Sequence, residues 1–200
     1  MRKVLFLQLI FFSAALFGQS EECTIGVASG AATPDGRPMI WKTRDYTEVD
    51  NEVRFNPSMK YDFIFVAKAG SSSAARMGVN EHGLAIVNST SSDLPDGSDT
   101  GLLNGELIRD GLGNCLTVEE FEDYLDETNL IGRRTNGNFA VIDSTGAAAI
   151  FEVGEFVYWR FDASDADNGY VLRTNFAVNG GGYTGKERLI RTVSLVNDFY

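Results

Sequence analysis

The order of the expected secondary-structure elements is the feature that most constrains the fold of this 200-residue chain. Segments typical of strands come first, two helical segments follow, further strands come next, and a helical segment closes the series. This block order favours α+β layers with largely antiparallel sheets over a doubly wound parallel sheet, in which strands and helices alternate. No internal repeat or low-complexity linker interrupts the chain, so we expect one domain after the N-terminal leader.

Three hairpins are predicted from pairs of apolar runs that are joined by turn-forming residues. Their strands cover residues 23–29 with 38–46, 76–79 with 84–88, and 138–142 with 147–153. Further strands are predicted over residues 61–67, 156–161 and 170–175. These hairpins and strands indicate largely antiparallel sheets.

Three helices are predicted from apolar spacing and from capping residues. The apolar residues of 103–115 recur at near-helical spacing. Thr117 and Glu120 form a capping-box pattern that begins a second helix. Thr184 and Glu187 cap a third helix, which continues to the last residue without a stop signal. We therefore expect that the fold is C-terminally incomplete in this chain.

The first twenty residues have the pattern of a secretory signal peptide. A basic start is followed by an apolar run over residues 4–17 and by the small-residue ending Gly18-Gln19-Ser20. The apolar run is short for a membrane span. We expect cleavage after Ser20, a short propeptide of residues 21–22, a domain over residues 23–200, and an exported protein, periplasmic or extracellular, with no membrane association once the leader is removed.

Charge and histidine content exclude several classes of function. The formal net charge of −11 leaves no basic face for nucleic acid, and the leader contributes none of the acidic residues. His82 is the only histidine, and the two cysteines are far apart in sequence, so the spacing of zinc ligands is missing. His82 lies in a turn pattern and is predicted to be exposed rather than a catalytic base. Composition leaves a homo-oligomer open.

The two cysteines allow two interpretations. In an exported protein, Cys23 and Cys115 could form a disulfide that staples a non-catalytic binding domain. Alternatively, Cys23 is a free catalytic thiol, and Cys115 is a small buried residue on the apolar face of a helix. Sequence alone leaves both interpretations open.

Several motifs, taken in order, carry a family resemblance. They are Cys23-Thr24, the 32–38 segment Ala-Thr-Pro-Asp-Gly-Arg-Pro, Trp41-Lys42-Thr43-Arg44-Asp45, residues 78–88 from Gly78 to Asn88, and residues 169–176 from Gly169 to Phe176. With these motifs the chain resembles the cysteine branch of the N-terminal nucleophile hydrolases, specifically the acyl-coenzyme A:6-aminopenicillanic acid acyltransferase and carcinine hydrolase family, related to the choloylglycine hydrolases. The resemblance implies a four-layer αββα fold, cleavage of a linear non-peptide amide in a small acylated amine, and no metal or organic cofactor.

The resemblance also implies roles for individual residues. Cys23 matches the nucleophile, and Asp45 matches the carboxylate that hydrogen-bonds the nucleophile's α-amine. Asn88 matches a residue that helps to form the oxyanion hole, and Asn175 matches a second asparagine that orients the tetrahedral intermediate. Taken singly, Asp45 could instead be a surface charge, and the asparagines could be turn formers at strand ends.

Positive charges are implied near the nucleophile as well. Lys42 occupies the position at which the choloylglycine branch has arginine, so the role of its charge differs from that branch. Arg188 best matches a late arginine of the family, but Arg191 is one helical turn away and remains an alternative. Either arginine could also be an ordinary solvated charge on the last helix.

An N-terminal cysteine would combine a nucleophile with its own base. The pKa of an α-amine is about 7.7 to 8.0, close to that of an ordinary thiol at about 8.5, so the amine can accept the thiol proton and later pass it to the leaving group. The product is a thioester acyl-enzyme, which water or another amine then resolves. This chemistry requires a second cut between Glu22 and Cys23, made by the enzyme itself or by another protease, because leader removal after Ser20 leaves Glu21-Glu22 attached.

Overall fold

The computed structural model describes residues 22–46, 49–71, 74–95 and 100–198. The predicted leader, its cleavage site and Glu21 lie outside these residues. The strands are β1 (Glu22–Ala28), β2 (Met39–Asp45), β3 (Asn51–Asn56), β4 (Phe63–Lys68), β5 (Met77–Asn80), β6 (Ala85–Thr90), β7 (Gly137–Ile142), β8 (Ala148–Val153), β9 (Tyr158–Asp162) and β10 (Tyr170–Arg173). The helices are α1 (Asn104–Asn114), α2 (Val118–Asn129) and α3 (Lys186–Asn197).

The described strands form two antiparallel sheets. The larger sheet has the order β3-β4-β5-β6-β7-β8-β9, so each strand pairs with its neighbour in sequence. The smaller sheet has the order β10-β1-β2, which places β1 in its centre. β1 pairs with β2 through a hairpin and with β10 from the far end of the chain. The strand β1 carries Cys23, the predicted nucleophile, which therefore lies in the centre of the small sheet.

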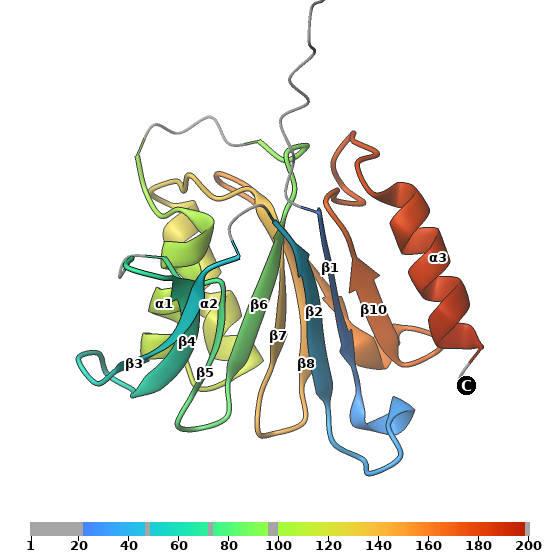
Figure 1. Cartoon of the computed structure of the whole chain (residues 1–200), viewed down its shortest axis with the longest axis horizontal. Coiled ribbons are helices and arrows are strands. Elements are labelled where there is room, and N and C mark those ends of the chain that lie inside the picture. The colour runs from blue at the N-terminus through green and yellow to red at the C-terminus, as the bar shows by residue number, and fades with distance from the viewer. Residues whose placement is uncertain (1–21, 47–48, 72–73, 96–99, 199–200) are drawn as a thin grey trace, which may run out of the picture.

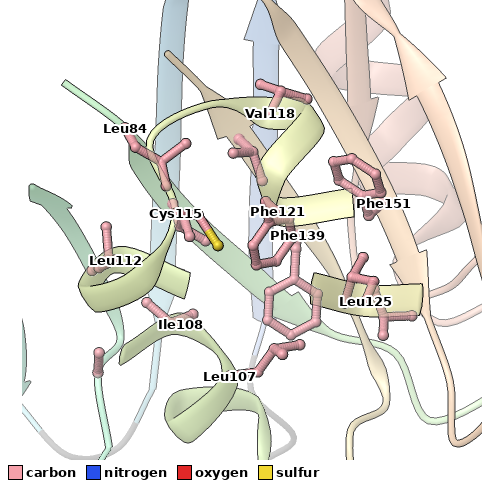
Figure 2. Packing of buried hydrophobic residues seen from close by; sticks show 14 of the residues in the cluster. Leu84, Leu107, Ile108, Leu112, Cys115, Val118, Phe121, Leu125, Phe139 and Phe151 are labelled. Carbon is pink, nitrogen blue, oxygen red and sulfur yellow. The ribbon is translucent and has the colours of Figure 1, made fainter. Parts of the chain in front are cut away.

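The elements stack in four layers (Figure 1). Helices α1 and α2 cover one face of the large sheet, and Leu107, Leu112, Phe121 and Leu125 from these helices are buried there with other apolar residues (Figure 2). The small sheet covers part of the opposite face, and α3 packs on the outer face of the small sheet. The predicted four-layer αββα arrangement with antiparallel sheets is therefore confirmed.

Burial on both faces of the large sheet explains the apolar run Ala148-Ala149-Ile150-Phe151 of its strand β8. β8 is buried along its whole length, because α2 lies on one side of it and β1 on the other. At the other edge, the small sheet does not reach β3 and β4, and Val53, Phe55 and Ile64 remain exposed. None of the described helices has both the length and the apolar character needed to cross a membrane.

The three predicted hairpins are confirmed, and three other details differ from the sequence-based expectation. Strand β3 was not predicted. Helix α3 begins after Gly185, whose φ of 81° lies in the left-handed region that glycine tolerates, and the predicted cap by the Thr184 side chain is wrong. Helix α3 also ends at Asn197, with Asp198 as its C-cap, rather than continuing to the last residue; residues 199–200 lie outside the described part.

Candidate active site

Cys23 lies near the start of the central strand of the small sheet. Its side chain has no exposed surface, and its partner on β2 is Arg44. On the other side, β1 pairs with β10 in a register that sets Ile25 opposite Arg173. Because antiparallel pairing continues two residues further in opposite directions, this register brings Cys23 opposite Asn175, just beyond the end of β10.

Asn175 is hydrogen-bonded directly to the Cys23 main chain. The Cys23 backbone nitrogen donates to Asn175 Oδ1 at 2.7 Å, and Asn175 Nδ2 donates to the Thr90 carbonyl at 2.9 Å. Asn175 is 5 % exposed, and its bond to the Cys23 nitrogen is buried. Asn175 therefore connects the nitrogen of the predicted nucleophile to the end of β6.

Arg188 extends this contact from α3. Its Nη1 donates to the Cys23 carbonyl at 2.8 Å, and its Nη2 donates to Asn175 Oδ1 at 2.9 Å. Its Nε lies 3.5 Å from a carboxylate oxygen of Glu22. Arg191, by contrast, is exposed on the same helix. The structure therefore distinguishes the two candidate arginines: Arg188 contacts Cys23 and Arg191 faces solvent.

Replacement of Arg188 by methionine should reduce turnover while Arg191→Met should not. Arg188→Met removes two charge-assisted hydrogen bonds of about 1.5 to 3 kcal/mol each, and we expect kcat/KM for amide cleavage to fall about 10- to 100-fold. The Arg191→Met variant is the matched control, with kcat/KM within about twofold of the wild type. Equal losses in the two variants would show that helix charge, and not the contact with Cys23, matters.

Lys42 and Asn88 form a second pair at the same end of the two sheets. Lys42 Nζ donates to Asn88 Oδ1 and to the Arg76 carbonyl, both at 3.2 Å. Lys42 on β2 is the register partner of Ile25 on β1, which lies two residues from Cys23. Asn88 lies on β6 and is 8 % exposed. Hydrogen bonds therefore join Cys23, Asn175 and Arg188 at β1, and Lys42 and Asn88 between β2 and β6.

Asp45 lies near this site, but the hydrogen bond from the Cys23 nitrogen goes to Asn175 rather than to Asp45. It is the register partner of Glu22 at the end of β2, and its side chain is exposed. The Cys23 nitrogen is a peptide amide in the uncut chain, and the acceptor 2.7 Å away is Asn175 Oδ1. The expected bond from Asp45 to a free α-amine belongs to the cleaved protein and remains a prediction.

The interpretation of a Cys23–Cys115 disulfide is wrong. Both cysteines are free and buried in the described structure. Cys115 packs among the apolar residues between the helices and the large sheet (Figure 2), whereas Cys23 lies in the small sheet. Burial and the nearby charge of Glu120 raise the pKa of the Cys115 thiol to about 12, so it remains protonated and unreactive at neutral pH. A binding domain stapled by this disulfide is therefore excluded.

His82 is far from Cys23 along the strands. It follows β5 in the turn before β6, at the opposite end of β6 from Asn88 and Thr90, and its ring contacts Tyr61 edge-on. The prediction of an exposed turn histidine is confirmed. Among the described residues, no group of three or more His, Cys, Asp or Glu side chains could hold a metal ion.

Two acidic residues that sequence reasoning missed anchor the loop after Asn175. Glu152, fully buried on β8, accepts hydrogen bonds from the Arg173 guanidinium at 2.6 Å and from the backbone nitrogens of residues 178 and 179. Asp93 accepts from the backbone nitrogens of Ala177 and Gly182. A lone acidic residue within the otherwise apolar strand β8 was the available signal for Glu152. Both carboxylates keep the chain rigid where it leaves Asn175.

Comparison with known proteins agrees with this architecture. The family model described as "Acyl-coenzyme A:6-aminopenicillanic acid acyl-transferase" matches residues 31–192, a range that holds every predicted site residue except Glu22 and Cys23. No curated protein matches the chain. The predicted family is confirmed by this match; Cys23 lies outside the matched range, and its role as the nucleophile remains a prediction.

Two solved structures share the fold. A Caenorhabditis elegans N-acylethanolamine-hydrolyzing acid amidase ortholog is 14 % identical with a TM-score of 0.59, over 82 % of this chain and 73 % of that one. A conjugated bile acid hydrolase from Clostridium perfringens is 14 % identical with a TM-score of 0.52, over 75 % of this chain and 52 % of that one. The chain thus spans about half the length of the bile acid hydrolase. With the family model matched over most of its length, the chain belongs to the acyl-coenzyme A:6-aminopenicillanic acid acyl-transferase family.

Proposed function

We infer that the protein is an exported cysteine amidohydrolase that cleaves a linear non-peptide amide in a small N-acyl amine or N-acyl amino acid. The observation that carries this proposal is the joint contact of Asn175 and Arg188 with the main chain of Cys23. A buried thiol whose own nitrogen is held by a side-chain amide fits a nucleophile that uses this nitrogen as its base. The two structural neighbours are named for the hydrolysis of N-acylethanolamines and of conjugated bile acids, which supports an acylated amine as substrate.

The reaction proceeds in two steps on Cys23. The α-amine takes the thiol proton, the sulfur attacks the acyl carbon, and the carbonyl oxygen becomes an oxyanion. Asn175 Nδ2 carries a second hydrogen besides the one donated to Thr90, and an amide donor of this kind stabilises an oxyanion. The C–N bond then breaks, the amine leaves with the proton, and a thioester remains. Water attacks the thioester and releases the acid and the free thiol.

The reaction requires a cut between Glu22 and Cys23. In the uncut chain the Cys23 nitrogen is an amide, which is too weakly basic to accept the thiol proton. The Glu22 carboxylate lies 3.5 Å from Arg188 Nε, so one guanidinium contacts both sides of the bond to be cut. Attack of the Cys23 thiol on the Glu22 carbonyl carbon would break the Glu22–Cys23 C–N bond, with the thiol proton passing to the departing nitrogen, and would leave Glu22 as a thioester on Cys23. Water would hydrolyse the thioester, releasing the Glu22 carboxylate and the free thiol, and the protein would then be activated by its own chemistry.

An acyltransferase is the second candidate, and the name of the matching family favours it. Both enzymes form the same acyl-Cys23 thioester and differ in what resolves it. An acyltransferase would use a second amine in place of water, which requires room for that amine beside the thioester. One product analysis can therefore separate the two candidates, because it shows whether the acyl group goes to water or to an acceptor amine.

The test is product analysis with the mature, full-length protein. We expect it to release free acid from an N-acyl amine or N-acyl amino acid, and to do so at a rate that added acceptor amines change by less than about twofold. Acyl transfer to the acceptor in preference to water would replace the hydrolase assignment by the acyltransferase. Absence of both products over a panel of acyl lengths would contradict amide chemistry at Cys23.

A further inference from the structure

A buried side-chain amide clamps the backbone on both sides of Asn175. Asn138 lies on β7, has no exposed surface, and lies on the face of the large sheet that meets the small sheet. Its Nδ2 atom donates to the Thr174 carbonyl at 3.0 Å and to the Phe176 carbonyl at 3.1 Å. Because these carbonyls flank Asn175, one amide group fixes the chain immediately before and after it.

Ser89 shares in this clamp and links it to β6. Its hydroxyl donates to the Thr174 carbonyl at 2.5 Å and accepts from Asn138 Nδ2 at 3.2 Å. Ser89 follows Asn88 on β6 and pairs with Asn138 across the ladder. The clamp therefore connects the strand that carries Asn88 to the segment that carries Asn175.

The clamp lies where the backbone hydrogen bonds between β10 and β1 have ended. Strand β10 ends at Arg173, so residues 174–176 extend beyond the regular pairing with β1. The next anchors along the chain are Glu152 and Asp93, which hold residues 177–182. Between these two supports, Asn138 and Ser89 hold the main-chain carbonyls on either side of Asn175, and the Thr174 hydroxyl donates to the Gly185 carbonyl.

Asn138 also differs from a purely structural asparagine in the same sheet. Asn80 satisfies both ends of its amide: Nδ2 donates to the carbonyls of Leu112 and Cys115, and Oδ1 accepts from the nitrogens of His82 and Leu84. In Asn138 only the donor end is satisfied, and the buried Oδ1 has no partner among the described residues. An unsatisfied buried acceptor costs about 1 to 3 kcal/mol. The Asn138 amide therefore donates to the carbonyls on either side of Asn175, while its own buried oxygen makes no compensating hydrogen bond within the described residues.

We propose that Asn138 is a positioning residue for the reaction at Cys23. By holding the carbonyls of Thr174 and Phe176, it keeps Asn175 Oδ1 within hydrogen-bonding distance of the Cys23 nitrogen and of Arg188. The catalytic consequence rests on the proposed amidase function. Misplacement of a catalytic group by on the order of 1 Å costs on the order of 10²-fold in rate.

The experiment compares Asn138→Ala with Asn80→Ala, the matched control at the opposite end of the strands. Asn138→Ala removes the donor to the Phe176 carbonyl, while the Thr174 carbonyl keeps the Ser89 hydroxyl. Asn80→Ala releases two carbonyls and two backbone nitrogens, so we expect it to lose at least as much Tm as Asn138→Ala. We expect kcat to fall about 10- to 100-fold in Asn138→Ala, with KM within about threefold, and to stay within about threefold in Asn80→Ala. In an Asn175→Ala background, Asn138→Ala should cause less than about twofold further loss, because its effect passes through Asn175.

A second readout does not depend on turnover. The side-chain amide resonance of Asn175, observed by NMR with nitrogen-15 labelling, should shift and lose protection from hydrogen exchange in Asn138→Ala and should be unchanged in Asn80→Ala. An unchanged Asn175 resonance, or a loss of kcat that is fully additive with Asn175→Ala, would overturn the positioning role. If the wild type cleaves no amide, the proposed function fails, and the resonance alone decides whether Asn138 positions Asn175.

Discussion

Cys23→Ala should lower kcat for amide cleavage by on the order of 10⁶-fold, the scale seen when a nucleophile is removed from an enzyme that forms an acyl intermediate. Without the sulfur no thioester can form, and the oxyanion donors alone give little rate. The substitution replaces the fully buried CH2SH side chain by a methyl group, so we expect the free energy of unfolding to fall by only about 1 kcal/mol. Steady-state kinetics and thermal unfolding on the same samples separate these two effects.

Cys115→Ala is the matched control for this prediction. Cys115 is also a free, buried cysteine, but it packs in the core between the helices and the large sheet, and its raised pKa keeps the thiol protonated. We expect Cys115→Ala to keep kcat within about threefold of the wild type. If Cys23→Ala keeps its activity, or if only Cys115→Ala loses it, then Cys23 is not the nucleophile.

Arg133→Met should cause the largest loss of stability. Arg133 is fully buried, and its guanidinium donates to the carbonyls of Leu125 and Gly154 and to the side chains of Thr128 and Asn129. These bonds join the C-terminal turn of α2 to the end of β8. Burial lowers the pKa of Arg133 to about 10, which still leaves it charged at neutral pH. The substitution removes these donors from the Gly154 carbonyl and the Asn129 side chain, at about 1 to 3 kcal/mol for each acceptor, while the Leu125 carbonyl keeps the Thr128 hydroxyl as a donor.

We expect Arg133→Met to lower the free energy of unfolding by about 3 kcal/mol and the Tm by roughly 6 to 12 °C. Denaturant and thermal unfolding measure both quantities. The neighbouring Arg134 is exposed, so Arg134→Met should change the free energy of unfolding by less than about 0.5 kcal/mol. A loss below about 1 kcal/mol in Arg133→Met would show that water or a rearranged side chain satisfies the released acceptors.

The hairpins could be predicted because local turn chemistry and apolar alternation agree with the final sheet. Strand β3 could not, because its apolar residues Val53 and Phe55 lie on a part of the sheet that the small sheet does not cover, and they remain 72 % and 60 % exposed. Alternation of polar and apolar residues without burial is a weak signal, and β3 is recognisable only by its pairing with β4.

The sequence could nominate residues for the candidate site, but it could not predict which of them contact one another. Cys23, Asn175 and Arg188 follow from motif order, but their hydrogen bonds depend on β10 returning to pair with β1 from about 150 residues away along the chain. The sequence favoured Arg188 and kept Arg191, one helical turn away, as an alternative; only the structure shows that Arg188 contacts Cys23 and that Arg191 is exposed. Asn138 carries no sequence signal of its role, because its partners are main-chain carbonyls, which any residue type supplies.

The identity of the first residue of the active protein tests the central claim most directly. Mass spectrometry of the purified full-length protein, with amide cleavage measured on the same sample, identifies that residue. If Cys23 supplies both nucleophile and base, the active wild type begins at Cys23. If the enzyme makes the second cut itself, Cys23→Ala retains Glu21-Glu22. An active wild-type protein that begins at Glu21 would contradict the account, because its Cys23 nitrogen would still be a peptide amide.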